Sequence, residues 1–315
     1  MDQRQSRARA GLAFALVSAG TFGLAGPLGK SLLDTGWSPL GVVLARISGA
    51  AVLLVLPLVV ILARGWRPRR AHVRTTLLYG AAAVAGAQVC FFNAVEHLSV
   101  GVALLLEYLA PVLLIGWTWL RTGLPPTRMT VAGAALALGG LTLVLDVLGD
   151  ARVDPVGVIW GLGAAVCLSV FYQTSASDDA PPPLVLAACG MLVATAVVLF
   201  VGVVGILPLD VGAAAASVGG VELPWWGPVL LLAGVSTVVA YSTGIVAIGI
   251  LGTRVASFVG LTEVLFAVLA AWWLVAERPS LPQAVGGLLV LGGIAVVRAG
   301  QRVLSTDRPD PVPVG

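Results

Sequence analysis

Residues Val100–Leu120 read VGVALLLEYLAPVLLIGWTWL, an almost entirely apolar stretch that contains one carboxylate, Glu107, and one proline, Pro111. At a helical rise of about 1.5 Å per residue, such a stretch reaches roughly 30 Å, the thickness of the hydrocarbon core of a bilayer. A carboxylate there costs at least about 2.5 kcal/mol on insertion scales, so it is expected to face other helices rather than lipid. The stretch therefore predicts a membrane-spanning helix with a buried acid. A second acid, Glu263, stands in a similar apolar stretch near the other end of the chain.

The whole chain has the composition of a membrane protein. Of its 315 residues, 58% are hydrophobic and 10% are charged, whereas a soluble domain carries about 25% charged residues. The mean hydropathy is +1.01. The three cysteines lie in apolar stretches without a CxxC pattern. They predict neither a disulfide framework nor a zinc site, and we expect no metal and no cofactor.

Apolar runs separated by charged or proline-rich breaks predict ten membrane spans. The spans are Ala10–Leu33, Leu40–Ala63, Thr75–Val95, Val100–Leu120, Arg128–Leu145, Pro155–Gln173, Leu184–Leu207, Trp225–Ile250, Thr253–Ala276 and Leu281–Val297. The eighth and ninth spans would be joined by a very tight turn at Leu251–Thr253. The runs are too long for the strands of a membrane barrel, so the predicted fold class is an all-α integral membrane protein.

A shift of 154 residues lays the first half of the chain on the second. Ser99–Leu120 then falls on Thr253–Leu274, and both stretches place a carboxylate in a helix that ends with a Trp-Leu pair. We expect residues 1–150 to form a first repeat of five helices, 151–300 a second repeat and 301–315 a polar cytoplasmic tail. Because five is an odd number, the second repeat must be inverted in the membrane. Inverted repeats with a site between them are a common plan of transporters.

The arginines indicate the orientation of the chain. Most of them fall in loops that would share one side of the membrane. The cationic residues in the loops of the opposite side are Lys30, Arg152 and Arg278. The positive-inside rule then places both termini in the cytoplasm. We expect a multi-pass protein of the cell (inner) membrane that contacts membrane lipids and does not bind nucleic acid.

Polar side chains inside the spans are candidates for substrate binding or coupling. Glu107 and Arg46 lie about 11 and 12 Å from the same surface, so an ion pair between them is geometrically possible. This pair would be a substrate or proton site, or a structural contact that fixes helix packing. Glu263, near the middle of its span, would be a proton relay or a neutral acid bonded to a neighbouring helix. Further candidates for contacts with a small polar substrate, or for interhelical hydrogen bonds, are Tyr108, Asn93, Gln88, Tyr172 and Tyr241.

Glycines and prolines predict close packing and kinks. Gly20, Gly23, Gly26 and Gly29 recur every third residue in the first span, as sites of close helix packing or as a hinge, and Pro27 is expected to kink the helix. Pro111 lies one turn beyond Glu107 and should free a backbone carbonyl beside the acid. Two charged residues after the ninth span, Glu277 and Arg278, are expected at a solvated helix terminus.

Three stretches resemble the EamA family of the drug/metabolite transporter superfamily. They are Ala103–Leu120 (ALLLEYLAPVLLIGWTWL), Cys167–Tyr172 (CLSVFY) and Leu261–Val297 (LTEVLFAVLAAWWLVAERPSLPQAVGGLLVLGGIAVV). The resemblance covers essentially the whole chain and implies ten-span carriers. Two departures stand out: Val264 follows Glu263 where the family usually has proline, and Gly123 stands where an acid would mirror Glu277. The LEYLAP sequence is most similar to members linked to amino-acid export.

Missing motifs narrow the function further. The sequence has no GxxxxGK[ST] phosphate loop and no GxSxG or HExxH motif, so neither ATP-driven transport nor an enzyme is indicated. We predict a secondary active transporter, a proton-coupled exporter of small metabolites such as amino acids. The alternative is a non-transporting membrane scaffold or lipid-handling protein.

Overall fold

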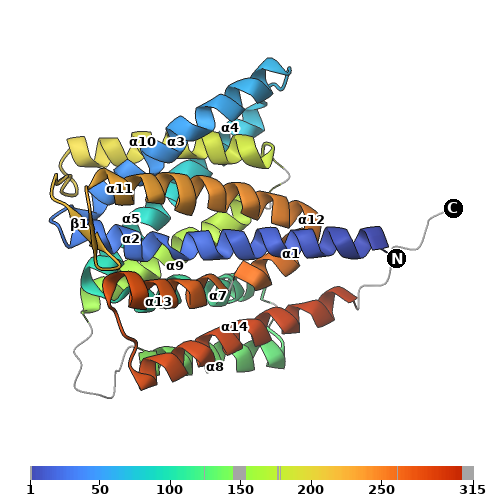
Figure 1. Ribbon diagram of the computed structural model, residues 1–315. Helices are drawn as coiled ribbons and strands as arrows, with labels where there is room; N and C mark the ends of the chain where they lie inside the picture. The colour runs from blue at the N-terminus through green and yellow to red at the C-terminus, as the bar shows by residue number, and fades with distance from the viewer. Residues whose placement is uncertain are drawn as a thin grey trace. The chain divides into compact units, whose positions relative to one another are not determined.

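A computed structural model describes residues 2–123, 125–144, 154–175, 177, 179–260 and 262–306, and these residues are predominantly helical (Figure 1). The first half contains α1 (Asp2–Gly23), α2 (Ala25–Leu33), α3 (Pro39–Ala63), α4 (Arg70–Leu78), η1 (Tyr79–Gly86), α5 (Ala87–His97), α6 (Val100–Glu107), α7 (Ala110–Thr122) and α8 (Arg128–Val144). The second half contains α9 (Pro155–Ser175), α10 (Pro183–Val203), β1 (Ala216–Val218), β2 (Val221–Leu223), α11 (Trp226–Leu230), η2 (Leu231–Val239), α12 (Ala240–Gly260), α13 (Thr262–Val275) and α14 (Leu281–Thr306).

Six helical stretches are long and apolar enough to cross a membrane. They are Ser6–Leu33, Pro39–Ala63, Arg70–His97, Pro155–Ser175, Pro183–Val203 and Trp226–Gly244, and two shorter apolar helices cover Thr262–Val275 and Leu281–Gly293. The all-α class is thereby confirmed. The number of ten spans stays an expectation.

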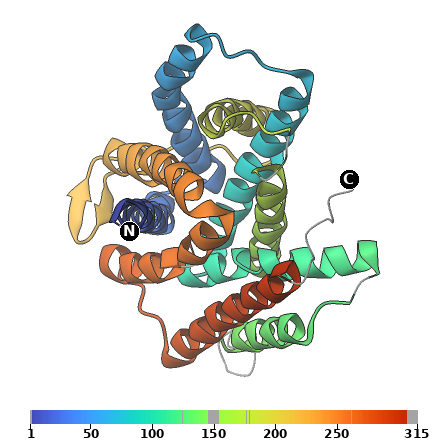
Figure 2. The same cartoon turned by 90° about the vertical axis from the view of Figure 1, so that its right-hand side faces the viewer.

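The chain forms two compact units, and each unit takes helices from both halves. The first unit comprises residues 1–107 and 154–279, and the second comprises 108–153 and 280–315. In the first unit α1 lies alongside α12, α3 alongside α10 and α5 alongside α9 (Figure 2). Its core is apolar, with Phe92, Leu32, Leu40, Ile47 and Met191 among the largest fully buried side chains.

In the second unit α8 and α14 pack through glycines in a symmetric, antiparallel way. A Cβ at Gly140 would lie 2.6 Å from the carbonyl oxygen of Gly286, and a Cβ at Gly293 would lie 2.5 Å from the carbonyl oxygen of Gly133. A shift of 153 residues along the sequence lays Gly133 on Gly286 and Gly140 on Gly293. The two contacts are therefore equivalent: the counterparts of the two residues in the first contact are the two residues that form the second. Such reciprocal contacts are typical of a two-fold relation. An antiparallel pair of equivalent helices is what inverted repeats require.

The expected span Val100–Leu120 is not one continuous helix. The helix α6 ends at Glu107, a turn covers Tyr108 and Leu109, and α7 starts at Ala110. Pro111 explains the interruption, because it has no N–H to donate to the carbonyl group of Glu107. Pro27 acts in the same way on the first span, which is interrupted at Leu24.

The predicted turn at Leu251–Thr253 was wrong, because α12 continues through it to Gly260. No proline interrupts this stretch, and a continued helix keeps backbone groups hydrogen-bonded in apolar surroundings. The next helix, α13, starts at Thr262.

Two π-helical segments also occupy nearly equivalent places. The segment η1 covers Tyr79–Gly86, which the same shift lays on residues 233–240, and η2 covers Leu231–Val239. In η1, a Cβ at Gly80 would lie 2.6 Å from the Cβ of Val193 on α10. In η2, the Cβ of Ala233 would lie 2.7 Å from a Cβ at Gly49 on α3. Single π turns often mark functional positions in helical proteins.

One short hairpin adds β structure that the sequence did not predict. Strands β1 and β2 pair antiparallel, and Gly219 and Gly220 form the turn with φ of +62° and +79°. Both angles lie in the region that glycine adopts without strain. The backbone N–H of Gly219 donates to the carbonyl oxygen of Leu274 (2.8 Å), so the hairpin is attached to the end of α13. Strands of three residues are too short for a recognisable alternation.

Candidate functional site

The centre of the candidate site is a buried arginine. Arg46 on α3 is only 4% exposed, and three of its N–H groups are hydrogen-bonded. Its Nε donates to Thr237 Oγ1 (2.8 Å), its Nη1 to Gln88 Oε1 (2.6 Å) and its Nη2 to the backbone carbonyl oxygen of Ser236 (3.1 Å). The ring of Phe92 lies 5.9 Å from the guanidinium carbon. Oriented neutral groups and an aromatic face thus take the place of water around this charge.

These partners join the two halves of the chain. Arg46 and Gln88 come from α3 and α5 of the first half, whereas Ser236 and Thr237 belong to η2 of the second. The Thr237 hydroxyl also donates to the carbonyl oxygen of Leu232 (2.8 Å), five residues earlier. The side chain of Thr237 therefore connects the π-helical backbone to the guanidinium.

The two acids lie near each other along neighbouring helices. The helices α6 and α13 are antiparallel, since Val100 at the start of α6 is bonded to Glu277 after the end of α13, and Glu107 at the end of α6 interacts electrostatically with Glu263 at the start of α13. They approach closely, because a Cβ at Gly101 would lie 3.1 Å from Cγ2 of Val268. At about 1.5 Å per residue, Glu107 lies about 9 Å from Gly101 along the axis of α6, and Glu263 lies about 7.5 Å from Val268 along the axis of α13. The two acids are therefore at similar heights. Both side chains are partly exposed.

Arg46 interacts electrostatically with Glu107, Glu263 and Tyr241. However, the direct ion pair between Arg46 and Glu107 that equal depth suggested is not formed. In the part of the chain that the structure describes, an ion pair joins Lys30 to Glu277, and a carboxylate oxygen of Asp154 lies 2.8 Å from Nδ1 of His97. Equal depth does not place two side chains on facing sides of their helices, and the Arg46 donors point to Gln88 and η2 instead.

The remaining four candidates lie in different surroundings. Tyr241 on α12 is half-buried, and its ring packs edge-to-face on Phe22 of α1 with centroids 4.9 Å apart. Asn93 is buried, but its amide donates to the carbonyl oxygen of Val89 in its own helix (2.7 Å), a structural role. Tyr108 is buried in the turn after α6 and belongs to the second unit. The side chain of Tyr172 lies outside the described residues.

Two further residues of the site, Ser236 and Thr237, were not predicted from the sequence, and both are completely buried. Two adjacent hydroxyl residues inside an apolar span were the available signal. A single sequence gives no reason to link them to Arg46, 190 residues away.

Glu277 also differs from the expectation of a solvated terminus. Its Oε2 accepts a hydrogen bond from the backbone N–H of Val100 (3.0 Å), and its Oε1 lies 3.4 Å from Nζ of Lys30. The tight packing predicted for the glycines of the first span is confirmed at Gly23, Gly26 and Gly29, whereas a Cβ at Gly20 would make only ordinary van der Waals contacts. A Cβ at Gly23 would lie 2.9 Å from the backbone nitrogen of Ala267 on α13.

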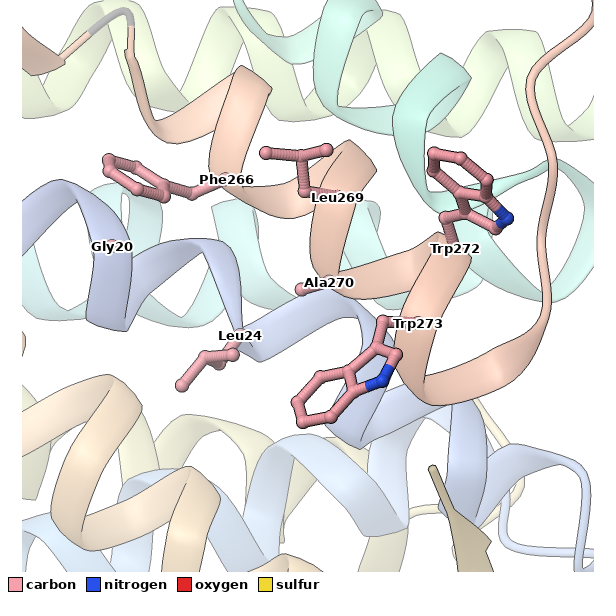
Figure 3. Close-up of a pocket in the computed structure, with 7 residues that line it drawn as sticks. All are labelled: Gly20, Leu24, Phe266, Leu269, Ala270, Trp272 and Trp273. Atoms are coloured by element: carbon pink, nitrogen blue, oxygen red, sulfur yellow. The ribbon is translucent and has the colours of Figure 1, made fainter. Parts of the chain in front are cut away.

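A second feature of the first unit is an apolar groove of about 570 Å³ (Figure 3). It is lined by Gly20, Leu24, Phe266, Leu269, Ala270, Trp272 and Trp273. No lining side chain is charged, so the groove suits a hydrophobic chain rather than an ionic ligand. In addition, no group of three or more metal-ligating side chains is found among the described residues.

Comparisons with known proteins agree with this architecture. A search of curated proteins finds no match. Among solved structures, 26 chains match. One crystal structure has a TM-score of 0.57 and 22% sequence identity, over 92% of this chain and 99% of that one. At this identity the likeness shows the fold alone. The model of the EamA-like transporter family matches residues 9–146 and again 155–299, one match in each half. The chain therefore belongs to the EamA-like transporter family.

Proposed function

We propose that the protein is a secondary active transporter that exports small metabolites, such as amino acids, in exchange for protons. The family and the apolar helices support membrane transport. In this proposal the chain crosses the membrane ten times as two inverted repeats. The repeats expose one central site alternately to the two sides of the membrane. The arginine distribution supports cytoplasmic termini.

The observation that carries this proposal is the buried Arg46 network between the two halves. A buried charge is costly unless it is hydrogen-bonded, so intramembrane charges are expected at functional places. Arg46 holds η2 against α3 and α5, and it interacts with two acids on α6 and α13. A change in the arrangement of the two halves would thereby alter the surroundings of both acids.

Each charged residue then has a distinct role. Glu107 and Glu263 are partly exposed, so they are the groups that we assign to proton and substrate binding. Arg46 is buried, and three of its N–H groups are already bonded within the protein. We assign it the role of a fixed counter-charge that keeps both acids in the site.

Reconstitution into proteoliposomes tests the proposal. Amino acids and other small metabolites are screened by counterflow, and the flux of each transported compound is measured with and without a pH gradient. We expect Glu107→Gln and Glu263→Gln to remove the dependence on the pH gradient, because glutamine cannot exchange a proton. The matched control is Glu96→Gln, an exposed glutamate at the end of α5. Flux in Glu107→Gln with unchanged pH dependence would contradict the assignment of Glu107.

The groove of Figure 3 favours a second candidate, a lipid-handling protein without solute transport. Its apolar lining suits an acyl chain. This candidate predicts that no compound shows counterflow and that a lipid co-purifies in fixed ratio, which native mass spectrometry detects. Replacing Ala270 with tryptophan would fill the groove and release such a lipid.

A further inference from the structure

Glu277 makes two contacts that the proposed transport does not yet explain. One oxygen of its carboxylate accepts the N–H of Val100, and the other pairs with Lys30, the only lysine of the chain. The Lys30 and Glu277 side chains are 23% and 20% exposed. This partial shielding makes the contact stronger than a fully solvated surface pair.

The three residues come from different helices and from both halves of the chain. Lys30 lies in the last turn of α2, Val100 is the first residue of α6, and Glu277 follows α13. The first N–H groups of a helix lack partners within it and attract negative charge. Glu277 supplies both the acceptor and the charge, so it attaches the start of α6 to the end of α13.

The same two helices carry the acids of the proposed site. Glu107 is the last residue of α6, about 10 Å from Val100 along the helix axis. Gly101 and Val268 are in close contact between the Glu277 contacts and the acids. On this side, α6 and α13 are therefore closed against each other above Glu107 and Glu263. The arginine distribution assigns this side to the outside.

We propose that Glu277 is a positioning residue which, with Lys30, latches the ends of α2, α6 and α13 and keeps the site closed to the outside. The latch rests on the proposed transport function, because alternating access requires these helix ends to separate when substrate leaves. Breaking the latch shifts the protein towards the outward-open arrangement. It leaves the proton-binding acids in place.

Three variants separate the two contacts. Lys30→Met removes the ion pair and keeps the helix cap. Glu277→Gln removes the charge but keeps an oxygen that accepts the N–H of Val100. Lys30→Arg preserves the ion pair and should behave as the parent protein. The matched control is Asp154→Asn, which removes the carboxylate from the contact between His97 Nδ1 and Asp154 (2.8 Å) at the start of α9.

The readout is labelling of a single cysteine, Ala103→Cys, by a membrane-impermeant maleimide in vesicles of known orientation. Cys90, Cys167 and Cys189 are first replaced with alanine. Ala103 is fully buried on α6 between the latch and Glu107. We expect Lys30→Met and Glu277→Gln to raise the labelling rate from the outside roughly two- to fivefold, the range of a partly shielded ion pair. Asp154→Asn and Lys30→Arg should leave the rate unchanged.

Equal labelling in the parent, Lys30→Met and Glu277→Gln would overturn the latch, as would a rise from both sides of the membrane. Lys30→Met decides the question if Glu277→Gln does not fold. Counterflow is measured on the same preparations. Counterflow without a labelling change contradicts the latch alone, whereas one-sided labelling without any counterflow contradicts the transport proposal.

Discussion

The Arg46 Nε lies 2.8 Å from the Thr237 hydroxyl, and this hydrogen bond joins α3 of the first half to the π-helical segment η2 of the second. Both residues are buried. Each half of the chain thereby contributes one side of a polar contact inside apolar surroundings. The contribution of this contact, and of the other close contacts between equivalent helices, to stability and transport can be measured.

Thr237→Val should destabilise the protein by about 1–3 kcal/mol, because it leaves the buried Nε of Arg46 without an acceptor. Valine has nearly the shape of threonine, so packing is preserved. Thermal unfolding of the purified protein in detergent gives the difference. The control is Thr243→Val, which removes a hydroxyl that bonds only to carbonyl groups of its own helical stretch. Equal stabilities of the two variants would mean that the Arg46–Thr237 bond contributes nothing.

Arg46→Lys should reduce transport at least about tenfold. A guanidinium reaches Thr237, Gln88 and Ser236 from three nitrogens, whereas an ammonium on a shorter stem reaches fewer of them. Each lost bond to a charged group is worth about 1.5–3 kcal/mol. Initial flux in proteoliposomes is the measurement, with Arg64→Lys at the exposed end of α3 as the control. Flux like that of the unmodified protein would argue against a fixed orientation of Arg46.

Gly140→Ala should destabilise the second unit by about 1–3 kcal/mol, as overpacked sites do. The new Cβ would stand 2.6 Å from a backbone carbonyl of α14, which cannot move without the whole helix. The neighbouring change Gly139→Ala meets nothing within 4 Å and should be neutral or stabilising. Comparison of the two melting temperatures is the test. A loss of stability in Gly139→Ala alone would mean that Gly139, and not Gly140, lies on the face of α8 that packs on α14.

Pro111→Ala should restore the missing N–H and allow the helix to continue through Tyr108 and Leu109. We expect slower amide hydrogen exchange at these residues and a several-fold lower flux, because the interruption lies beside Glu107. Pro57→Ala is the control, since α3 continues through Pro57 without interruption. Unchanged exchange at Tyr108 in the Pro111 variant would show that the turn does not depend on proline.

The sequence by itself determined the class of fold and the position of most helices. A hydrocarbon core leaves backbone groups no partners except their own helix, so long apolar runs specify helices wherever they occur. The bounds of α3, Pro39–Ala63, differ by one residue from the stretch Leu40–Ala63 that hydropathy alone predicts. The shift of 154 residues likewise predicted two halves, and the family model matches each half once.

Only the tertiary structure decided which side chains meet. Helical depth follows from counting residues, but the direction of a side chain around its helix depends on packing. For this reason depth paired Arg46 with Glu107, whereas the structure pairs it with Gln88, Ser236 and Thr237. Glu277 was expected in solvent because nothing in its sequence neighbourhood indicates Lys30 or Val100. Contacts between the halves arise from folding, and hydropathy along the chain contains no information about them.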